Sequence, residues 1–263
     1  MTTSFKTLFT VLLSVLVINT IVTNVTLRSE LGLEPQFIIL SLWKILLIGM
    51  VIVAIKKCKL DTVFVYKKNF WPVLLGSSII ILLSFYNVNR ALLFDGQEVS
   101  LSLQLWYLFS ALSTGGFEEV LFRVFVFNSL YTLFSKQEIN IRYLHSIIWT
   151  SLLFGGVHMV NLLKSDYDLF SVISQIIIAF GIGVLFQSLL IKYKNIFVVI
   201  TLHGLINYFG MYRFYLYTNT DEIVHNTVND YLSSLVLTIV FAASISVIGF
   251  LLIRKNISKE TSK

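Results

Sequence analysis

Two adjacent glutamates and an arginine lie in the middle of a long apolar stretch of this 263-residue chain. Glu118, Glu119 and Arg123 interrupt the apolar run Leu101–Phe134, which is long enough to cross a bilayer as a helix at about 1.5 Å per residue. Charged groups at such a depth are costly, so they indicate function when partners can be identified for them. These three residues are the first candidates for chemistry.

The spacing of the three side chains on a helix predicts different roles for the two glutamates. Glu119 and Arg123 are four residues apart and share one face, so we expect a buried ion pair. Glu118 is turned by about 100° from Glu119 on the helix, away from the same guanidinium. It is therefore expected to be the carboxylate that is left for chemistry. The alternative is that all three residues form one structural ion cluster.

Two histidines fall in other apolar spans, and these supply the next candidates. The chain has 4 histidines, and a buried histidine is more often a satisfied structural group than a catalyst. His158 follows Gly155-Gly156, and His203 is four residues before Asn207, so the last two side chains are neighbours on one helix face. Depths counted along the spans place Glu118 and His158 at a similar level and His203 a turn or two away. We therefore expect these groups to meet.

Together, these residues predict hydrolysis of an acyl bond. A carboxylate base, an ion pair, a second titratable group and two donors suit attack by water and stabilisation of the resulting oxyanion. No serine or cysteine is placed as a nucleophile, so water is the expected one. Glu118, His158 and His203 would also suit zinc, which lowers the pKa of its bound water to about 7.

The composition excludes an ordinary soluble protein, since 56% of the residues are hydrophobic and 13% are charged. It predicts an all-α, polytopic transmembrane bundle of about eight helices that forms a single membrane domain over residues 1–263. The expected spans are Thr7–Leu27, Phe37–Ile55, Phe70–Tyr86, Leu101–Phe134, Tyr143–Leu163, Phe170–Ile191, Asn195–Tyr212 and Tyr231–Ile253.

The positive charges indicate orientation in a membrane, and no nucleic-acid partner is expected. The net charge is +6, and the lysines and arginines concentrate in alternate connections between the spans. This bias predicts a multi-pass protein of the cell membrane with both termini in the cytoplasm and with basic residues near anionic lipid heads. Lys44 lies within the second span, and we interpret it mainly as a structural residue that extends to the membrane surface or faces a cavity.

The chain resembles the CPBP family of intramembrane proteases, also called the Abi or CAAX-protease-like family. The resemblance covers about residues 101–212, and the first three spans and the last are matched by hydropathy alone. It rests on three motifs in order on three spans, namely Glu-Glu-x-x-x-Arg at Glu118, Glu119 and Arg123, Phe-x-x-x-His at Phe154 and His158, and His-x-x-x-Asn at His203 and Asn207.

This resemblance implies an eight-helix membrane endopeptidase whose catalytic core spans about residues 101–212. A glutamate-activated water without a cofactor is favoured, and zinc held by Glu118, His158 and His203 is the alternative. The resemblance implies a role for each of three pairs of residues. Glu118 and His158 would activate the water, and Glu119 and Arg123 would hold the geometry of the site. His203 and Asn207 would bind the oxyanion.

The resemblance also implies a bacterial protein whose partner is a peptide or membrane-protein substrate. Its expected role is bacteriocin self-immunity, or the processing of peptides or surface proteins. CAAX processing itself is not expected where the host lacks prenylated proteins. A non-catalytic immunity or scaffold protein and a proton-coupled transporter that uses the same ionisable groups as a relay remain the alternatives.

Overall fold

The computed structural model describes residues 5–60, 71, 74, 99–163, 168–210, 212 and 228–260, and these residues form helices and short connections without a strand. The predicted all-α fold is confirmed. The helices are α1 Phe5–Leu27, α2 Leu33–Lys57, α4 Leu101–Glu119, the π-helix η1 Val120–Val126, α5 Phe127–Leu133, α6 Ile139–Gly156, the 3₁₀-helix η2 Val157–Leu163, α7 Leu169–Tyr193, α8 Ile196–Gly210 and α10 Val228–Glu260.

The described helices are those of a multi-pass membrane protein. Five spans are long and apolar enough to cross a bilayer, and α8 is a shorter apolar helix. The predicted span Leu101–Phe134 forms α4, η1 and α5 in succession. The predicted span Phe70–Tyr86 lies outside the described residues, apart from Trp71 and Leu74. The cytoplasmic location of both termini stays a prediction.

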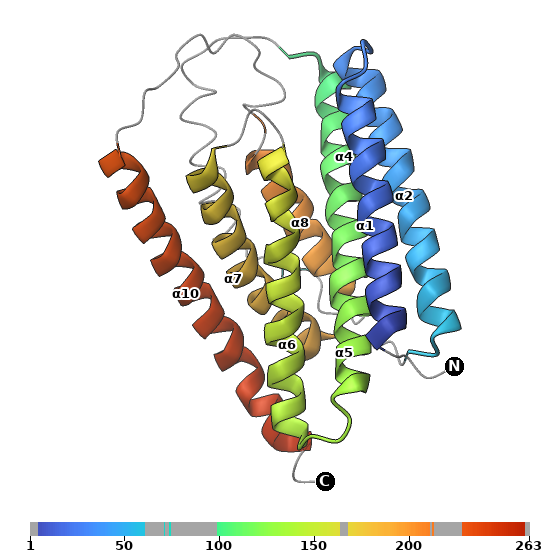
Figure 1. Ribbon diagram of the computed structural model, residues 1–263. Coiled ribbons are helices and arrows are strands. Elements are labelled where there is room, and N and C mark those ends of the chain that lie inside the picture. Colours follow the sequence, from blue (N-terminus) through green and yellow to red (C-terminus); the bar gives the residue numbers. More distant parts are fainter. Residues whose placement is uncertain are drawn as a thin grey trace. The chain divides into compact units, whose positions relative to one another are not determined.

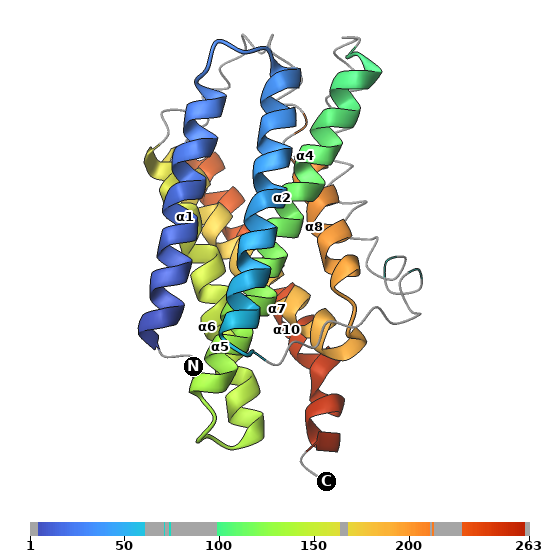
Figure 2. The same ribbon diagram turned by 90° about the vertical axis from the view of Figure 1, so that its right-hand side faces the viewer.

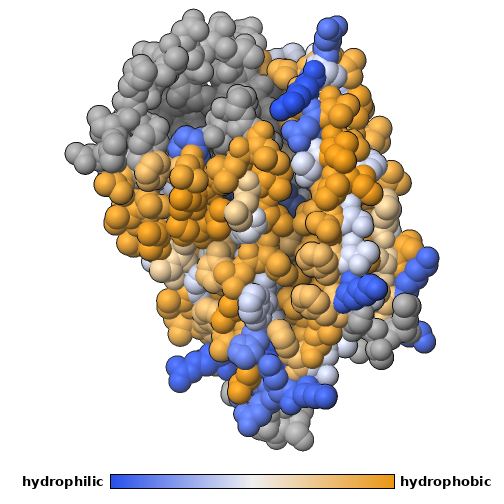
Figure 3. Space-filling view, in the orientation of Figure 1, coloured by the Kyte–Doolittle hydropathy of each residue, from blue (hydrophilic) through white to orange (hydrophobic). Residues whose placement is uncertain are grey.

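Apolar side chains cover most of the visible helical surface (Figure 3). On α1, the exposed residues include Phe9, Leu13, Val17, Ile21 and Val25, which recur every four residues along one face. Exposure of such a stripe to water costs about 25 cal/mol per Å² of apolar area, whereas exposure to lipid tails does not carry this cost. The surface therefore suits a lipid environment.

The chain divides into two compact units. Unit 1 comprises Met1–Phe125 and Asn195–Asp221, and unit 2 comprises Val126–Lys194 and Glu222–Lys263. In unit 2, α7 packs against α6 and α10. A Cβ atom added at Gly183 of α7 would lie 2.9 Å from the Ser151 Cβ on α6, as expected for a glycine that serves helix packing. A single domain over 1–263, with a core at about 101–212, stays a prediction.

Unit 1 brings α4 between α2 and α8, as seen in the two ribbon views (Figures 1 and 2). The contact between α4 and α8 depends on two glycines. A Cβ atom at Gly115 would lie 2.8 Å from the backbone nitrogen of Gly204, and one at Gly204 would lie 2.8 Å from the Leu112 Cα atom. The two backbones therefore approach as closely as they do because neither glycine has a side chain.

We expect Gly115→Ala to destabilise the folded protein by about 1–3 kcal/mol, because the new methyl group collides with the backbone of α8 and forces the helices apart. Gly49→Ala on α2 is the matched control, since an added Cβ atom there meets nothing within 4 Å. Thermal unfolding in detergent measures both variants. Equal melting temperatures for the two would contradict this account of the α4–α8 contact.

Candidate active site

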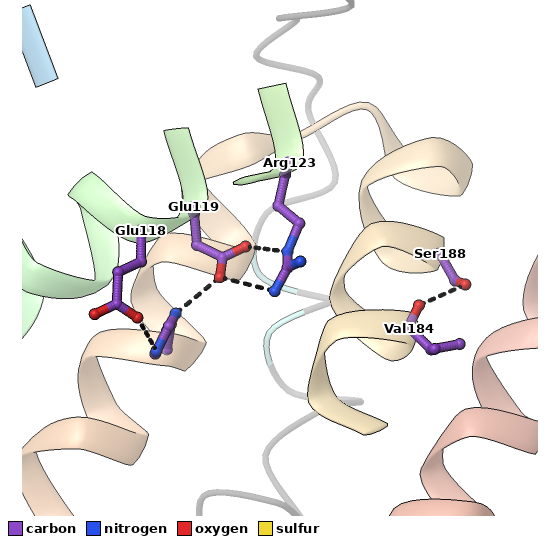
Figure 4. Close-up of polar contacts among 6 residues, drawn as sticks. Glu118, Glu119, Arg123, Val184 and Ser188 are labelled. Atoms are coloured by element: carbon purple, nitrogen blue, oxygen red, sulfur yellow. Dashed lines mark hydrogen bonds and ion pairs between the residues drawn. The ribbon is translucent and has the colours of Figure 1, made fainter. Parts of the chain in front are cut away.

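Both glutamates of the Glu-Glu pair face one imidazole, which α8 brings to the carboxyl end of α4. The His203 Nδ1 atom lies 2.8 Å from Glu119 Oε1, and the His203 Nε2 atom lies 3.4 Å from Glu118 Oε2. Dashed lines in Figure 4 mark these contacts next to the labelled glutamates. A carboxylate thus stands at each end of the ring, and His203 adjoins Gly204, the residue that allows α8 to approach α4.

The predicted ion pair between Glu119 and Arg123 is present in the structure. The Arg123 Nε atom donates a hydrogen bond to Glu119 Oε2 at 2.9 Å, and Arg123 Nη2 donates to Glu119 Oε1 at 3.4 Å. Both side chains are 0% exposed. Charge-assisted bonds of this kind are among the strong ones, and a buried charge needs them to offset its lost hydration. Glu119 is therefore fixed in place by an arginine and a histidine.

The Glu119 carboxylate determines which nitrogen of His203 carries hydrogen. An ionised carboxylate only accepts hydrogen bonds, so the Nδ1 atom must be the donor toward Glu119. The Nε2 atom then faces Glu118. Carboxylates and imidazoles are common proton-transfer groups in enzymes, and these two lie 3.4 Å apart. Glu118 and His203 therefore form an acid–base pair that Glu119 holds in position.

The two glutamates differ in exposure as well as in partners. The Glu118 side chain is 25% exposed, whereas that of Glu119 is fully buried. Glu118 contacts His203, and Arg123 donates its hydrogen bonds to Glu119. Of the two carboxylates, Glu118 is the one that water or a substrate can reach.

A π-helix follows the glutamates directly. Seven residues, from Val120 to Val126, form η1, and Arg123 lies within it. π-Helical turns are rare in proteins, and those that do occur often lie at functional sites. Sequence analysis predicts a regular helix here, since no proline or glycine between Val120 and Val126 signals a change of pitch.

Asn207 lies one turn after His203 on α8 and is half-buried. Its side-chain amide carries two N–H donors. The Tyr107 hydroxyl donates to the backbone oxygens of Asn207 and Tyr208, both at 3.1 Å. Sequence analysis missed Tyr107, because an aromatic residue near the end of a span is typical of the membrane interface.

His158 lies in unit 2, at the start of η2. Its Nδ1 atom is 3.0 Å from the Phe154 oxygen, and its ring packs edge-on against the Phe154 ring. Since Nδ1 donates to that carbonyl, Nε2 keeps its lone pair and can act as a base or a metal ligand. The structure brings Glu118, Glu119 and His203 together in unit 1; the meeting of His158 with them stays a prediction.

The spacing of Glu118 and His203 fits two different kinds of chemistry. The 3.4 Å between Glu118 Oε2 and His203 Nε2 suits an ion pair between the carboxylate and a protonated ring. It also matches two ligands of a tetrahedral zinc ion, which lie about 3.3 Å apart when each bond is about 2.0–2.1 Å. The Glu119 contact to Nδ1 is the kind of outer bond that orients a metal-binding histidine. Among the residues that the structure describes, no group of three metal ligands is assembled.

Comparison with known proteins identifies the segment that carries these residues. Residues 100–209 match the family model described as type II CAAX prenyl endopeptidase Rce1-like. The match begins at the start of α4, ends in α8 and includes all six candidate residues. No curated protein and no solved structure matches the chain significantly. This segment is therefore similar to the CAAX-protease-like family of proteases.

Proposed function

We propose that this protein is an intramembrane endopeptidase that hydrolyses a peptide bond of a membrane-associated peptide or protein. One observation carries the proposal, namely the row of contacts from Glu118 through His203 and Glu119 to Arg123. It combines an accessible carboxylate, an adjacent imidazole and a buried group that fixes both. The protease family of the segment 100–209 supports the same reaction class.

In the proposed reaction, Glu118 is the general base. As the water oxygen bonds to the carbonyl carbon, the water proton passes to the Glu118 carboxylate. A protonated His203, held through Nδ1 by Glu119, then offers its Nε2–H to the oxyanion, and the Asn207 amide offers a second donor. Glu118 returns the proton to the amine nitrogen as the C–N bond breaks. His158 assists the activation of water, as the family resemblance implies.

A bound zinc ion is the alternative route to the same products. Glu118 and His203 would hold it, with His158 as the third ligand, and it would supply a bound water of lowered pKa. We favour the route without metal, which the family resemblance implies. The substrate would be a peptide or membrane protein in either case, with bacteriocin immunity or surface-protein processing as the proposed roles.

Replacement of Glu118 by Gln is expected to reduce cleavage at least 10²-fold, because the amide cannot accept the water proton. The assay uses internally quenched peptides in proteoliposomes, and a prenylated CAAX-type peptide is included in the set. Folding should be preserved, since Glu118 is partly exposed. Cleavage at the wild-type rate by Glu118→Gln would contradict the proposal, and proton-coupled uptake without a peptide product would favour a transporter.

Replacement of Glu119 by Gln is expected to destabilise the protein by about 3–5 kcal/mol, because it leaves the buried Arg123 charge uncompensated. The isosteric change Glu118→Gln is the matched control and should cost much less, since that side chain is 25% exposed. Chemical unfolding in detergent compares the two variants. The account of Glu119 as the anchor is wrong if both variants unfold at the same denaturant concentration.

Prolonged dialysis against a chelator is expected to leave peptide cleavage intact, and purified protein should contain far less than one zinc ion per chain. This outcome follows if a carboxylate activates the water directly. Elemental analysis of the same sample provides the control for a tightly held ion. Loss of cleavage that added zinc restores would instead establish the metal-dependent route.

A further inference from the structure

Tyr107 lies near the start of α4, and its hydroxyl group is turned into the protein. The residue is 4% exposed, and its hydroxyl oxygen lies 3.1 Å from the backbone oxygens of Asn207 and Tyr208 on α8. A tyrosine near the end of a membrane span usually directs its polar tip toward the water interface. The inward bond to a second helix therefore needs an explanation other than anchoring at the interface.

Aromatic side chains fix the direction of this hydroxyl group. The centre of the Tyr107 ring lies 5.1 Å from that of the Phe37 ring on α2. It lies 5.1 Å from the centre of the Tyr208 ring and 6.1 Å from that of the Tyr212 ring. Aromatic rings at such distances attract one another, and a closely packed ring has few orientations available to it. The packing of the ring therefore holds the hydroxyl group toward α8.

The bond from Tyr107 joins α4 to the turn of α8 that carries Asn207. A carbonyl oxygen has two lone pairs, so it can accept this hydrogen in addition to a bond from its own helix. One turn earlier on α8, Gly204 meets α4 at Leu112, where a Cβ atom added to the glycine would lie 2.8 Å from the Leu112 Cα atom. The turn from Gly204 to Asn207 is therefore fixed against α4 at both of its ends.

The proposed reaction requires His203 and Asn207 to direct their donors at the same oxyanion. Such donors are effective when they lie about 2.7–3.1 Å from the position of the oxyanion, and a misplacement of about 1 Å can cost about 10²-fold in rate. Glu119 of α4 fixes the His203 ring through Nδ1 at 2.8 Å. Tyr107 of the same helix bonds to the backbone of Asn207. Helix α4 therefore provides a fixing contact for each of the two proposed donors.

We infer that Tyr107 is a positioning residue for the proposed hydrolysis, whose hydroxyl group holds the Asn207 turn of α8 so that the Asn207 amide reaches the oxyanion. This inference rests on the proposed function. Tyr107 itself touches neither the substrate nor a transferred proton. Its role requires only a donor hydrogen at the far end of a packed aromatic ring, so a ring without that donor should keep the fold and lose the positioning.

The test compares Tyr107→Phe with 4-aminophenylalanine in place of Tyr107 in the quenched-peptide assay. Loss of the hydroxyl group is expected to lower kcat about 10-fold with little change in KM, because the positioned donor acts on the transition state. The 4-amino group keeps a donor at the same place and should restore most of the rate. Tyr131→Phe is the matched control, since the Tyr131 ring also packs against aromatic neighbours, Phe127 and Tyr143. An unchanged kcat in Tyr107→Phe, or a loss that the 4-amino group does not restore, would overturn the inference.

A double-mutant cycle shows whether Tyr107 acts through Asn207. Tyr107→Phe should lower kcat in the wild-type background and have little further effect in Asn207→Ala, since the group that it positions is already absent there. Losses that multiply would assign the effect of Tyr107 to general packing and overturn the inference. Cleavage at the wild-type rate by Asn207→Ala would also overturn it.

A measurement without substrate separates this inference from the proposed function. NMR of protein labelled with ¹⁵N-asparagine reports the motion of the Asn207 side chain, whose signal is assigned by its loss in Asn207→Asp. The order parameter of this amide should fall in Tyr107→Phe and stay unchanged in Tyr131→Phe. Where wild-type protein cleaves no peptide, the proposed function fails, and a lower order parameter still shows that Tyr107 holds Asn207. Where Glu118→Gln abolishes cleavage but Tyr107→Phe changes neither kcat nor the order parameter, the inference fails and the proposed function stands.

Discussion

The structure of unit 1 depends on how one buried carboxylate is neutralised. Glu119 is fully buried and accepts hydrogen bonds from Arg123 and His203. Without these partners, its burial would cost several kcal/mol. With them, it fixes the tautomer of His203 and directs the Nε2 atom toward Glu118. The buried Glu119 therefore positions the imidazole that contacts the more accessible Glu118.

Close packing of the helices makes this arrangement geometrically feasible. Glycines at 115 and 204 let the backbones of α4 and α8 approach to a distance that any side chain would prevent. Because His203 is next to Gly204 in sequence, the same contact that joins the helices delivers the ring to the carboxylates. Helix α2 also packs on α4, where Lys44 and Ile48 contact the positions of Phe117 and Gly116.

Local rules of helix geometry predicted much of this from the sequence. The i, i+4 spacing predicted the Glu119–Arg123 pair, and the 100° turn per residue separated Glu118 from it. Hydropathy predicted the all-α fold. The π-helix after Glu119 was not predictable, because no proline or glycine marks it. The inward turn of Lys44 depends on Asn19 and Phe117, which only tertiary packing brings near it. The approach of His158 to Glu118 stays a prediction.

The central claim is that Glu119 holds His203 with hydrogen on Nδ1, so that Nε2 faces Glu118. Nitrogen NMR of ¹⁵N-histidine-labelled protein in lipid bilayers tests it most directly, with the His203 signal assigned by its loss in His203→Gln. The account predicts a protonated Nδ1 across the pH range in which the protein is folded, with only Nε2 changing its protonation. A His203 ring with hydrogen on Nε2 and a bare Nδ1 would contradict it.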